Sequence, residues 1–267
     1  MSSKKDADQL SFWGHLEVLR HCLFRILAVT LVAGIAAFCF KNLLFSVVLA
    51  PKSPDFITYR LFERLVGPLQ SFEVGLINIE LAQQFIIHLK VALWMGFIIV
   101  SPYVIYVLFG FVSPALYQTE RKYAVRAVLG GYVMFMLGVL LNYFLIFPLT
   151  FRFLGTYQVD PSVNNVISLD SYISTLLMLS LTMGIIFELP VLCWLLAKMG
   201  IMKAAFMKKY RRHAIVVIVI VAAIITPTGD AFTLTLVSLP IYLLFELSVL
   251  IVRRTERRAA QAEVPQA

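Results

Sequence analysis

The stretch Met183–Trp194, MGIIFELPVLCW, places a glutamate and a proline inside one long apolar run. The run covers residues 172–196, which is long enough to cross a membrane as a helix. A carboxylate at the centre of such a helix costs about 2.5–3.5 kcal/mol to insert, so an intramembrane acid is usually functional. Pro190 lacks the backbone N–H and predicts a kink near Glu188. We therefore expect a broken membrane helix with a functional carboxylate at the break.

Two small residues share a helix face with this glutamate. Ser180 and Gly184 precede Glu188 at spacings of four residues, which places all three on one side of the helix. Because a carboxylate is costly to turn toward lipid, the face is expected to line a wetted concavity. The alternative is a neutral glutamic acid that is hydrogen-bonded between helices.

The composition indicates a protein that crosses the membrane several times. Of the 267 residues, 60% are hydrophobic and 14% are charged, and the net charge is +8. A soluble domain has about 25% charged residues. The basic residues lie in short clusters between apolar runs, which is typical of membrane topology rather than of nucleic-acid binding. The three cysteines lack metal-ligand spacing, and neither a metal nor a cofactor is expected.

Six apolar runs predict an all-α integral membrane protein with six transmembrane helices around a concave groove. A helix needs about 20 residues to cross the hydrocarbon layer. The fifth run is too short and the sixth contains Pro240, so the last two helices are expected to be short and to form a shallow hairpin. The runs are Leu23–Phe40, Phe85–Phe111, Val125–Phe147, Tyr172–Leu196, Ala214–Ile225 and Phe232–Val252.

Lys and Arg are concentrated on one side of these spans, which predicts that both termini are cytoplasmic. Residues 1–22 are expected to form an amphipathic cytoplasmic segment, and residues 23–252 the membrane domain. The outside loops 41–84 and 148–171 carry prolines and mixed charge, so a structured cap is expected there. The basic cytoplasmic tail, 253–267, is expected to be disordered.

Two cytoplasmic segments combine an acid with basic residues. HLEVLR, at 15–20, carries Glu17 and Arg20 on the polar side of an amphipathic helix, where an ordinary ion pair between them is the simplest interpretation. ERK begins at Glu120, whose simplest role is to offset the neighbouring positive charge.

Five motifs follow one another in order along nearly the whole chain. They are HLEVLR (15–20), SPALYQTERK (113–122), IFPLTFRFL (146–154), FELPV (187–191) and TPTGDAF with PIYLLFE (226–232 and 240–246). In this order and spacing they resemble TatC, the multispanning core subunit of the twin-arginine protein translocase.

The resemblance implies a receptor whose cytoplasmic face binds the twin-arginine signal peptides of folded precursor proteins. By this resemblance, Glu120 corresponds to the family's loop carboxylate and Phe111 to its loop phenylalanine. At the amino-terminal segment the resemblance points to Glu17 and Arg20, although the family pattern is H-L-x-E-L-R and the acid here stands one residue early. One residue corresponds to about 100° around a helix. Carboxylates suit this role because a guanidinium group donates two parallel hydrogen bonds to them.

The resemblance also implies single-span partners of the TatA and TatB type, further copies of the chain, and the bacterial inner membrane. Transport would draw on the proton-motive force without a cofactor. The residues expected at an intramembrane groove or partner site are Glu188, Glu246, Pro51 and Asp230.

The main alternative is a proton-coupled secondary transporter or channel that uses Glu188 and Glu246 as a relay. The chain has no internal repeat, unlike many such transporters. An enzyme is not expected, because the H-E-x-x-H and G-x-S-x-G motifs are absent from the sequence.

Overall fold

The computed structural model describes residues 12–67, 74–112, 121–160, 162, 165–226 and 229–263. Over these ranges the regular structure is helical apart from one pair of short strands. The elements are α1 (Phe12–Phe38), α2 (Lys41–Val48), η1 (Ala50–Lys52), α3 (Ile57–Val66), β1 (Gly75–Ile77), α4 (Gln83–Val112), α5 (Arg121–Leu141), η4 (Asn142–Ile146), α6 (Phe147–Thr156), β2 (Val166–Ser168), α7 (Leu169–Ile186), α8 (Leu189–Lys198), α9 (Ala204–Lys209), α10 (Arg211–Ile225) and α11 (Ala231–Glu263).

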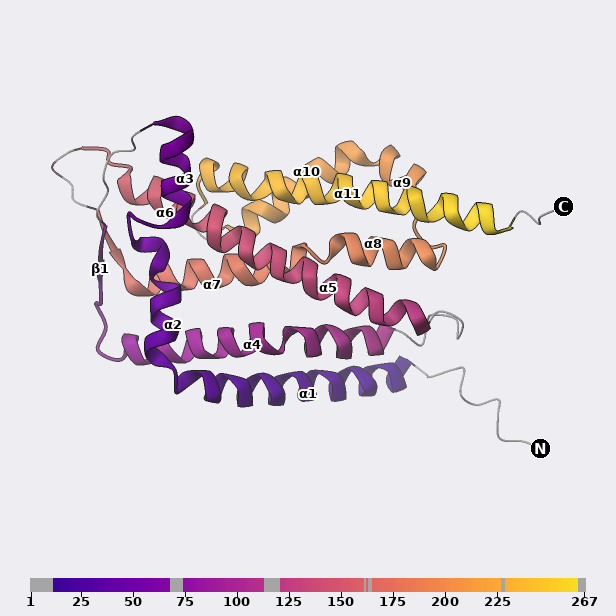
Figure 1. The fold of residues 1–267 in the computed structure, drawn as a ribbon, viewed down its shortest axis with the longest axis horizontal. Helices are drawn as coiled ribbons and strands as arrows, with labels where there is room; N and C mark the ends of the chain where they lie inside the picture. The colour runs from indigo at the N-terminus through magenta and orange to yellow at the C-terminus, as the bar shows by residue number, and fades with distance from the viewer. Residues whose placement is uncertain are drawn as a thin grey trace.

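The long helices lie side by side in one bundle (Figure 1). At its edge α1 packs on α4, while α5 packs on α4, α7 and α8, and α11 packs on α8, α9 and α10. The backbones of α1 and α4 approach closely at two glycines: a Cβ built on Gly96 would lie 2.5 Å from the backbone nitrogen of Gly34. Small residues at a crossing are a usual means of helix association in lipid.

Five helices in the described part of the chain are long and apolar enough to cross a membrane, which confirms the prediction of an all-α membrane protein. The 15 residues of α10 span only about 22 Å, so this helix is short, as predicted. In contrast, α11 continues through Pro240 for 33 residues, and the prediction of a short last helix is wrong. The candidate spans are Leu16–Phe38, Gln83–Phe111, Val128–Thr156, Leu169–Lys198 and Ala231–Ala259.

The two loops predicted to face outward are folded into a cap at one end of the bundle, which we call the cap end (Figure 1). The first loop contributes α2, η1, α3 and β1, and the second contributes α6 and β2. The strands pair in parallel, with Gly75 opposite Val166 and Ile77 opposite Ser168. Two segments far apart in sequence are therefore joined through backbone hydrogen bonds.

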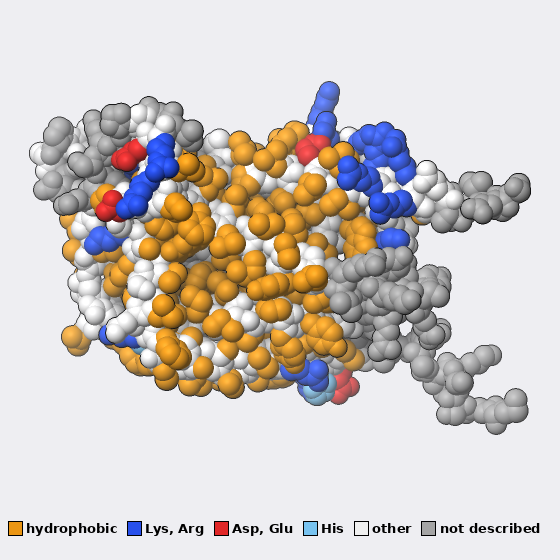
Figure 2. All heavy atoms as spheres, viewed as in Figure 1, with side chains coloured by type: hydrophobic (Ala, Val, Ile, Leu, Met, Phe, Trp, Pro, Cys, Tyr) orange, Lys and Arg blue, Asp and Glu red, His pale blue; other side chains and the backbone are white. Residues whose placement is uncertain are grey.

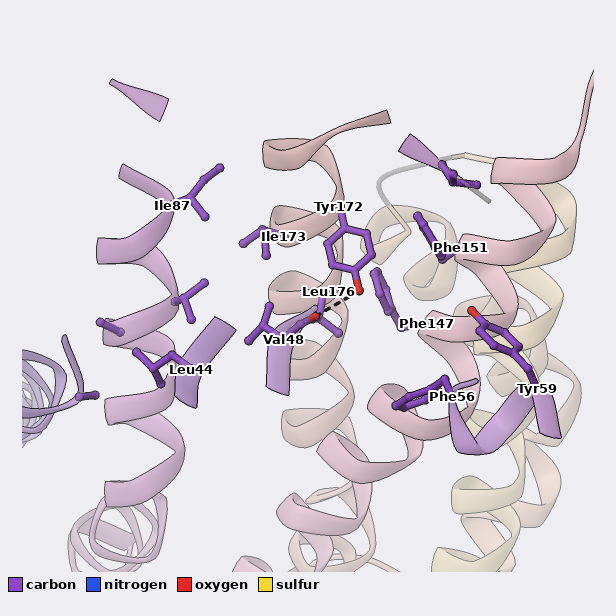
Figure 3. Packing of buried hydrophobic residues seen from close by; sticks show 14 residues of the cluster. Leu44, Val48, Phe56, Tyr59, Ile87, Phe147, Phe151, Tyr172, Ile173 and Leu176 are labelled. Carbon is purple, nitrogen blue, oxygen red and sulfur yellow. Dashed lines mark hydrogen bonds between the residues drawn. The ribbon is translucent and has the colours of Figure 1, made fainter. Parts of the chain in front are cut away.

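Tyrosine hydroxyls attach the cap to the bundle. Tyr172 of α7 donates to the carbonyl oxygen of Val48 at 3.1 Å (Figure 3). Tyr59 of α3 lies 3.0 Å from the carbonyl oxygens of both Pro51 and Pro148. Val48 ends α2 and Pro51 lies in the three-residue η1, where carbonyls lack partners within the helix, so these hydroxyls supply donors to them. Burial raises the pKa of Tyr59, which keeps its hydroxyl protonated and able to donate.

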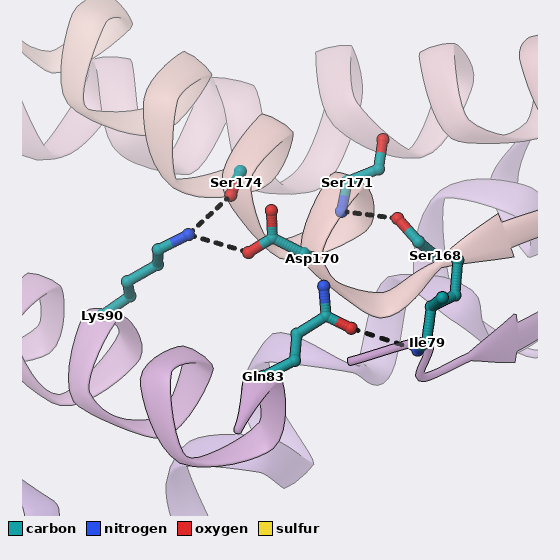
Figure 4. A network of polar contacts seen from close by, with 7 residues as sticks. All are labelled: Ile79, Gln83, Lys90, Ser168, Asp170, Ser171 and Ser174. Carbon is teal, nitrogen blue, oxygen red and sulfur yellow. Dashed lines mark hydrogen bonds and ion pairs between the residues drawn. The ribbon is translucent and has the colours of Figure 1, made fainter. Parts of the chain in front are cut away.

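Polar contacts also join the first turns of α4 to the start of α7. The ammonium group of Lys90 lies 2.7 Å from a carboxylate oxygen of Asp170 and 3.4 Å from the hydroxyl of Ser174 (Figure 4). Close by, the side-chain oxygen of Gln83 accepts a hydrogen bond from the N–H of Ile79 at 3.3 Å. The Lys90 contacts hold α4 and α7 together beside the cap, and the Gln83 contact fixes the chain that leads into α4.

The opposite end of the bundle is rich in positive charge, and we call it the basic end. The first turns of α1, the last turn of α4, all of α9 and the last turns of α11 lie there (Figure 1). Figure 2 shows hydrophobic side chains over the middle of the visible face, and Lys and Arg side chains gathered near α9 and the end of α11. This distribution is that of a protein whose middle lies in lipid.

The carboxy-terminal residues from Arg253 continue α11 as a helix to Glu263, so the prediction of a disordered tail fails for residues 253–263. One oxygen of the Glu256 carboxylate accepts a hydrogen bond from the N–H of Ala204 at 3.0 Å. This contact caps the first turn of α9 and holds that helix against α11.

Candidate functional site

The helix break predicted from the proline is present and contains the intramembrane glutamate. α7 ends at Ile186 and α8 begins at Leu189, with Phe187 and Glu188 in a turn between them. Pro190 occupies the first turn of α8, where a missing N–H leaves no helical hydrogen bond unmade. The predicted kink is therefore confirmed, and it places Glu188 within the span Leu169–Lys198.

The small face that precedes Glu188 packs against α5 and η4. Ser180 is fully buried, and its hydroxyl accepts a hydrogen bond from the side-chain amide of Asn142 at 2.8 Å. A Cβ built on Gly184 would lie 2.6 Å from the ring of Phe135. Ser180 and Gly184 thus form a close helix interface, and the prediction that they line a wetted concavity is wrong.

The carboxylate of Glu188 lies beside the backbone of α5. A Cβ built on Gly131 would lie 2.9 Å from Oε2 and 3.3 Å from Oε1 of Glu188, so only glycine leaves room for the carboxylate there. The side chain is part-buried, and Oε1 is buried without a hydrogen-bond partner among the described residues. A buried unpaired polar atom costs about 1–3 kcal/mol. The site can therefore gain free energy by accepting a hydrogen bond from a donor that enters it.

The other three residues predicted for the groove lie in settings of their own, away from Glu188. In α11, Glu246 accepts two hydrogen bonds from the guanidinium of Arg211, with Oε1 2.6 Å from Nε. Asp230 caps α11, because its carboxylate accepts the N–H of Thr233 at 2.7 Å. Pro51 is buried in η1.

These positions do not come together in one site. η1 and the start of α11 lie at the cap end, whereas Glu246 lies far along α11 toward the basic end (Figure 1). Glu188 stands between them at the α7–α8 break. A proton relay from Glu188 to Glu246 is not favoured by this arrangement, since Arg211 holds both carboxylate oxygens of Glu246.

Three of the four residues predicted to bind signal peptides are described, and their helices bring them to the basic end. Glu17 and Arg20 are exposed on the first turns of α1, and Phe111 is half-buried in the last turn of α4. The ion pairs found among described residues are Arg60–Asp55, Lys90–Asp170 and Arg211–Glu246, so Glu17 and Arg20 do not pair with each other. Glu120 lies outside the described residues.

Sequence reasoning missed Asn142, Gly131 and Arg211. Asn142 is fully buried at the start of the π-helical stretch η4, and its position inside a predicted span was a usable signal because amides seldom face lipid. Gly131 gave no signal of its own, since only the folded structure brings the carboxylate beside it. Arg211 contacts Glu246 across 35 positions of sequence, which only the packing of α10 on α11 reveals.

The family model of the Sec-independent protein translocase protein (TatC) matches residues 14–240 of the chain. The chain belongs to the TatC family. The resemblance carried by the sequence motifs is thereby confirmed, and the chain is a membrane component of a protein translocase rather than a member of an enzyme family.

Relatives and solved structures of the TatC family cover nearly the whole chain. The TatC of Blattabacterium sp. subsp. Periplaneta americana is 34% identical over 259 residues, which cover 93% of this chain and 97% of the relative. The TatC of Aquifex aeolicus is 31% identical over 250 residues, which cover 93% of this chain and 97% of the relative. A crystal structure of the twin arginine translocase receptor TatC superimposes with a TM-score of 0.73 at 31% identity, over 91% of this chain and 99% of that one. A crystal structure of the same receptor in DDM gives a TM-score of 0.74 at 31% identity, over 89% of this chain and 98% of that one.

Proposed function

We propose that the chain is the receptor subunit of a twin-arginine translocase and binds the signal peptides of folded precursor proteins at the basic end. The observation that carries the proposal is its likeness to the solved twin arginine translocase receptor over 91% of the chain, with a TM-score of 0.73. The exposed Glu17 on the first turns of α1, close to the last turn of α4, supports the location.

The arginine pair is bound by Glu17 and Glu120, with Arg20 and Phe111 beside them. Glu17 has no ion-pair partner among the described residues, so both of its oxygens can accept the parallel hydrogen bonds of one guanidinium. Glu120 directly precedes α5 and takes the second arginine. Exposed pairs contribute about 0.2–1 kcal/mol each. The apolar part of the signal peptide therefore has to add to the affinity by lying against the membrane helices.

The receptor lies in the bacterial inner membrane with both termini in the cytoplasm, and α10 crosses as a short sixth span. Positive charge at the basic end supports this orientation, because cytoplasmic segments are enriched in Lys and Arg. Single-span subunits of the TatA and TatB type and further copies of the chain assemble on its apolar surface. Glu188 handles the bound signal or a partner helix, and its unpaired oxygen supports this role.

Binding of a twin-arginine signal peptide to the full chain in detergent tests the proposal. Glu120→Gln is expected to weaken binding up to about fivefold, because it removes the charge that pairs with a guanidinium. Glu80→Gln is the matched control, since Glu80 is an exposed acid near the cap end. A peptide with two lysines in place of the arginines should bind both proteins weakly. An unaltered dissociation constant in Glu120→Gln would reject Glu120 as a contact.

Crosslinking probes at positions 17, 18 and 120 locate the peptide independently of affinity. The arginine pair is expected to crosslink at 17 and 120. Crosslinks found only at the cap end would overturn the proposed site as a whole.

A further inference from the structure

A cavity of 380 Å³ opens at the basic end, where α9, α10 and α11 meet. Its wall combines charged side chains with two apolar ones, and every member of its lining lies in one of these three helices. The residues are Lys208, Arg211, Glu246, Val249, Leu250 and Arg253.

The walls of this cavity are held in place by two contacts between helices. The guanidinium of Arg211 is fixed by its two hydrogen bonds to the carboxylate of Glu246. On the other side, Glu256 of α11 accepts the N–H of Ala204 at the start of α9, the helix that carries Lys208. The three helices and the Arg211 guanidinium are therefore already in place when an anion binds, which favours affinity.

The cavity has a surplus of positive charge. Three cationic side chains and one carboxylate line it, and that carboxylate is already bonded to Arg211. Neither Lys208 nor Arg253 belongs to an ion pair formed within the described residues. A guanidinium has five N–H donors, and Arg211 uses two of its nitrogens for Glu246, so further donors remain. The lining thus suits an anion with several acceptor oxygens.

The position of the cavity along the helices corresponds to the edge of the hydrocarbon layer. Arg253 directly follows the apolar run that ends at Val252, and Arg211 begins α10 just before its own apolar run. From Leu250 in the cavity wall, Leu247 and Leu243 continue along the same face of α11 toward the cap end, and the three are 52%, 42% and 58% exposed. An anion bound here therefore has an open apolar stripe beside it, on the side of the membrane interior.

We propose that this cavity binds the phosphodiester group of an anionic phospholipid, whose acyl chain lies along the leucine stripe of α11. Basic pockets between membrane helices on the cytoplasmic side are suited to such headgroups. A soluble phosphate would use the cations but leave the apolar stripe uncovered. The cavity is distinct from the proposed signal-peptide site, because a positively charged wall repels an arginine pair.

Titration of the full chain in detergent with phosphatidylglycerol, followed by native mass spectrometry, tests this proposal. The variant Lys208→Gln/Arg253→Gln is expected to bind the lipid about 30-fold more weakly, from the usual contribution of two basic side chains near an anionic surface. The matched control is Arg257→Gln/Arg258→Gln, which removes the same charge from exposed positions farther along α11. The control should bind within about threefold of the unchanged chain. Arg253→Lys, which keeps the charge, should retain most of the binding.

Phosphatidylcholine, inorganic phosphate and glycerophosphoglycerol serve as the other probes. Phosphatidylcholine should bind weakly because its headgroup has no net charge. Equal affinity for glycerophosphoglycerol and the intact lipid would show a site for free anions and overturn the lipid proposal. Equal losses in the two double variants would show diffuse attraction and also overturn it. Signal-peptide affinity, measured on the same proteins, is expected to stay unchanged. Failure of the lipid proposal can therefore be distinguished from failure of the receptor proposal.

Discussion

The cap end and the basic end are built from the same long helices but are stabilised in opposite ways. At the cap end, tyrosine side chains that are 1–2% exposed donate hydrogen bonds to carbonyl oxygens, and aromatic rings pack around them. At the basic end, Glu17, Arg20, Lys208 and Arg253 are exposed and take part in no ion pair formed within the described residues. Satisfied polar groups fix the helices at one end, while unpaired charges at the other end remain able to bind ligands.

This difference predicts separate consequences for mutations at the two ends. A change at the cap end removes packing and hydrogen bonds that exist in the isolated chain, so it should alter stability. A change to one of the exposed, unpaired charges at the basic end removes contacts made only with a ligand, so it should alter affinity and leave stability nearly constant.

The largest effect is expected for Tyr59→Ala in α3. Tyr59 is 1% exposed and contacts two carbonyl oxygens, so its truncation should lower the free energy of unfolding by about 3–5 kcal/mol. Denaturant unfolding in detergent measures this loss. Tyr157→Ala is the control, because Tyr157 is 64% exposed and should change stability by less than about 0.5 kcal/mol. Equal losses in both variants would contradict a rigid cap.

A smaller effect is expected for Gly131→Ala, midway between the two ends. The new Cβ would lie 2.9 Å from Oε2 of Glu188 and 3.2 Å from Cγ2 of Ile105, and overpacking of this kind costs about 1–3 kcal/mol. Gly130→Ala is the matched control, since nothing lies within 4 Å of its added Cβ. Combining Gly131→Ala with Glu188→Ala should remove part of the cost. A cost that persists in full would show that Glu188 does not occupy this space.

The third prediction concerns affinity at the basic end. Glu17→Ala should weaken signal-peptide binding by up to about fivefold, because one exposed arginine contact is lost, and should leave the unfolding free energy unchanged. The exchange Glu17→Val with Val18→Glu moves the acid to the family's usual position and should restore at least part of the affinity. Neutral behaviour of Glu17→Ala would show that the amino-terminal contact comes from another residue.

The smallest effect is expected for Lys90→Gln beside the cap. The Lys90–Asp170 pair is half-exposed, with side chains 43% and 36% accessible, so its loss should cost about 0.2–1 kcal/mol. The stability difference between Lys90→Gln and the unchanged chain should shrink in about 1 M salt, where charges are screened within about 3 Å. A difference independent of salt would mean that packing, not charge, explains the effect.

The features that the sequence predicted correctly depend on local physics. The length of an apolar run decides whether a helix can cross lipid, and Pro190 decides where α7 must end, so the long spans and the break at Glu188 were predictable. The short α10 was predictable for the same reason. The family motifs were also recognisable in the sequence, because each is a continuous stretch of the chain.

The features that the sequence did not predict depend on what a helix faces. The spacing of Ser180 and Gly184 defined a face of α7, but only the position of Asn142 and Phe135 on the neighbouring helix shows that this face is buried. The helical tail was missed although its composition favours a helix, because residues 253–263 are mostly Arg, Ala, Glu and Gln. The contact of Glu256 with α9 also holds that part of α11 in place.

α1 is synthesised before α4, the helix on which it packs. Between the end of α1 at Phe38 and the start of α4 at Gln83, the ribosome adds about 45 residues, which takes a few seconds at about 5–20 residues per second. During this interval α1 has no α4 to pack on. Its composition allows this, because only 11% of its most apolar window is buried even in the finished bundle. Because α1 lies at the edge of the bundle, it does not depend on a partner helix while the chain is being made. α4 packs on it later, at the close approach of Gly34 and Gly96.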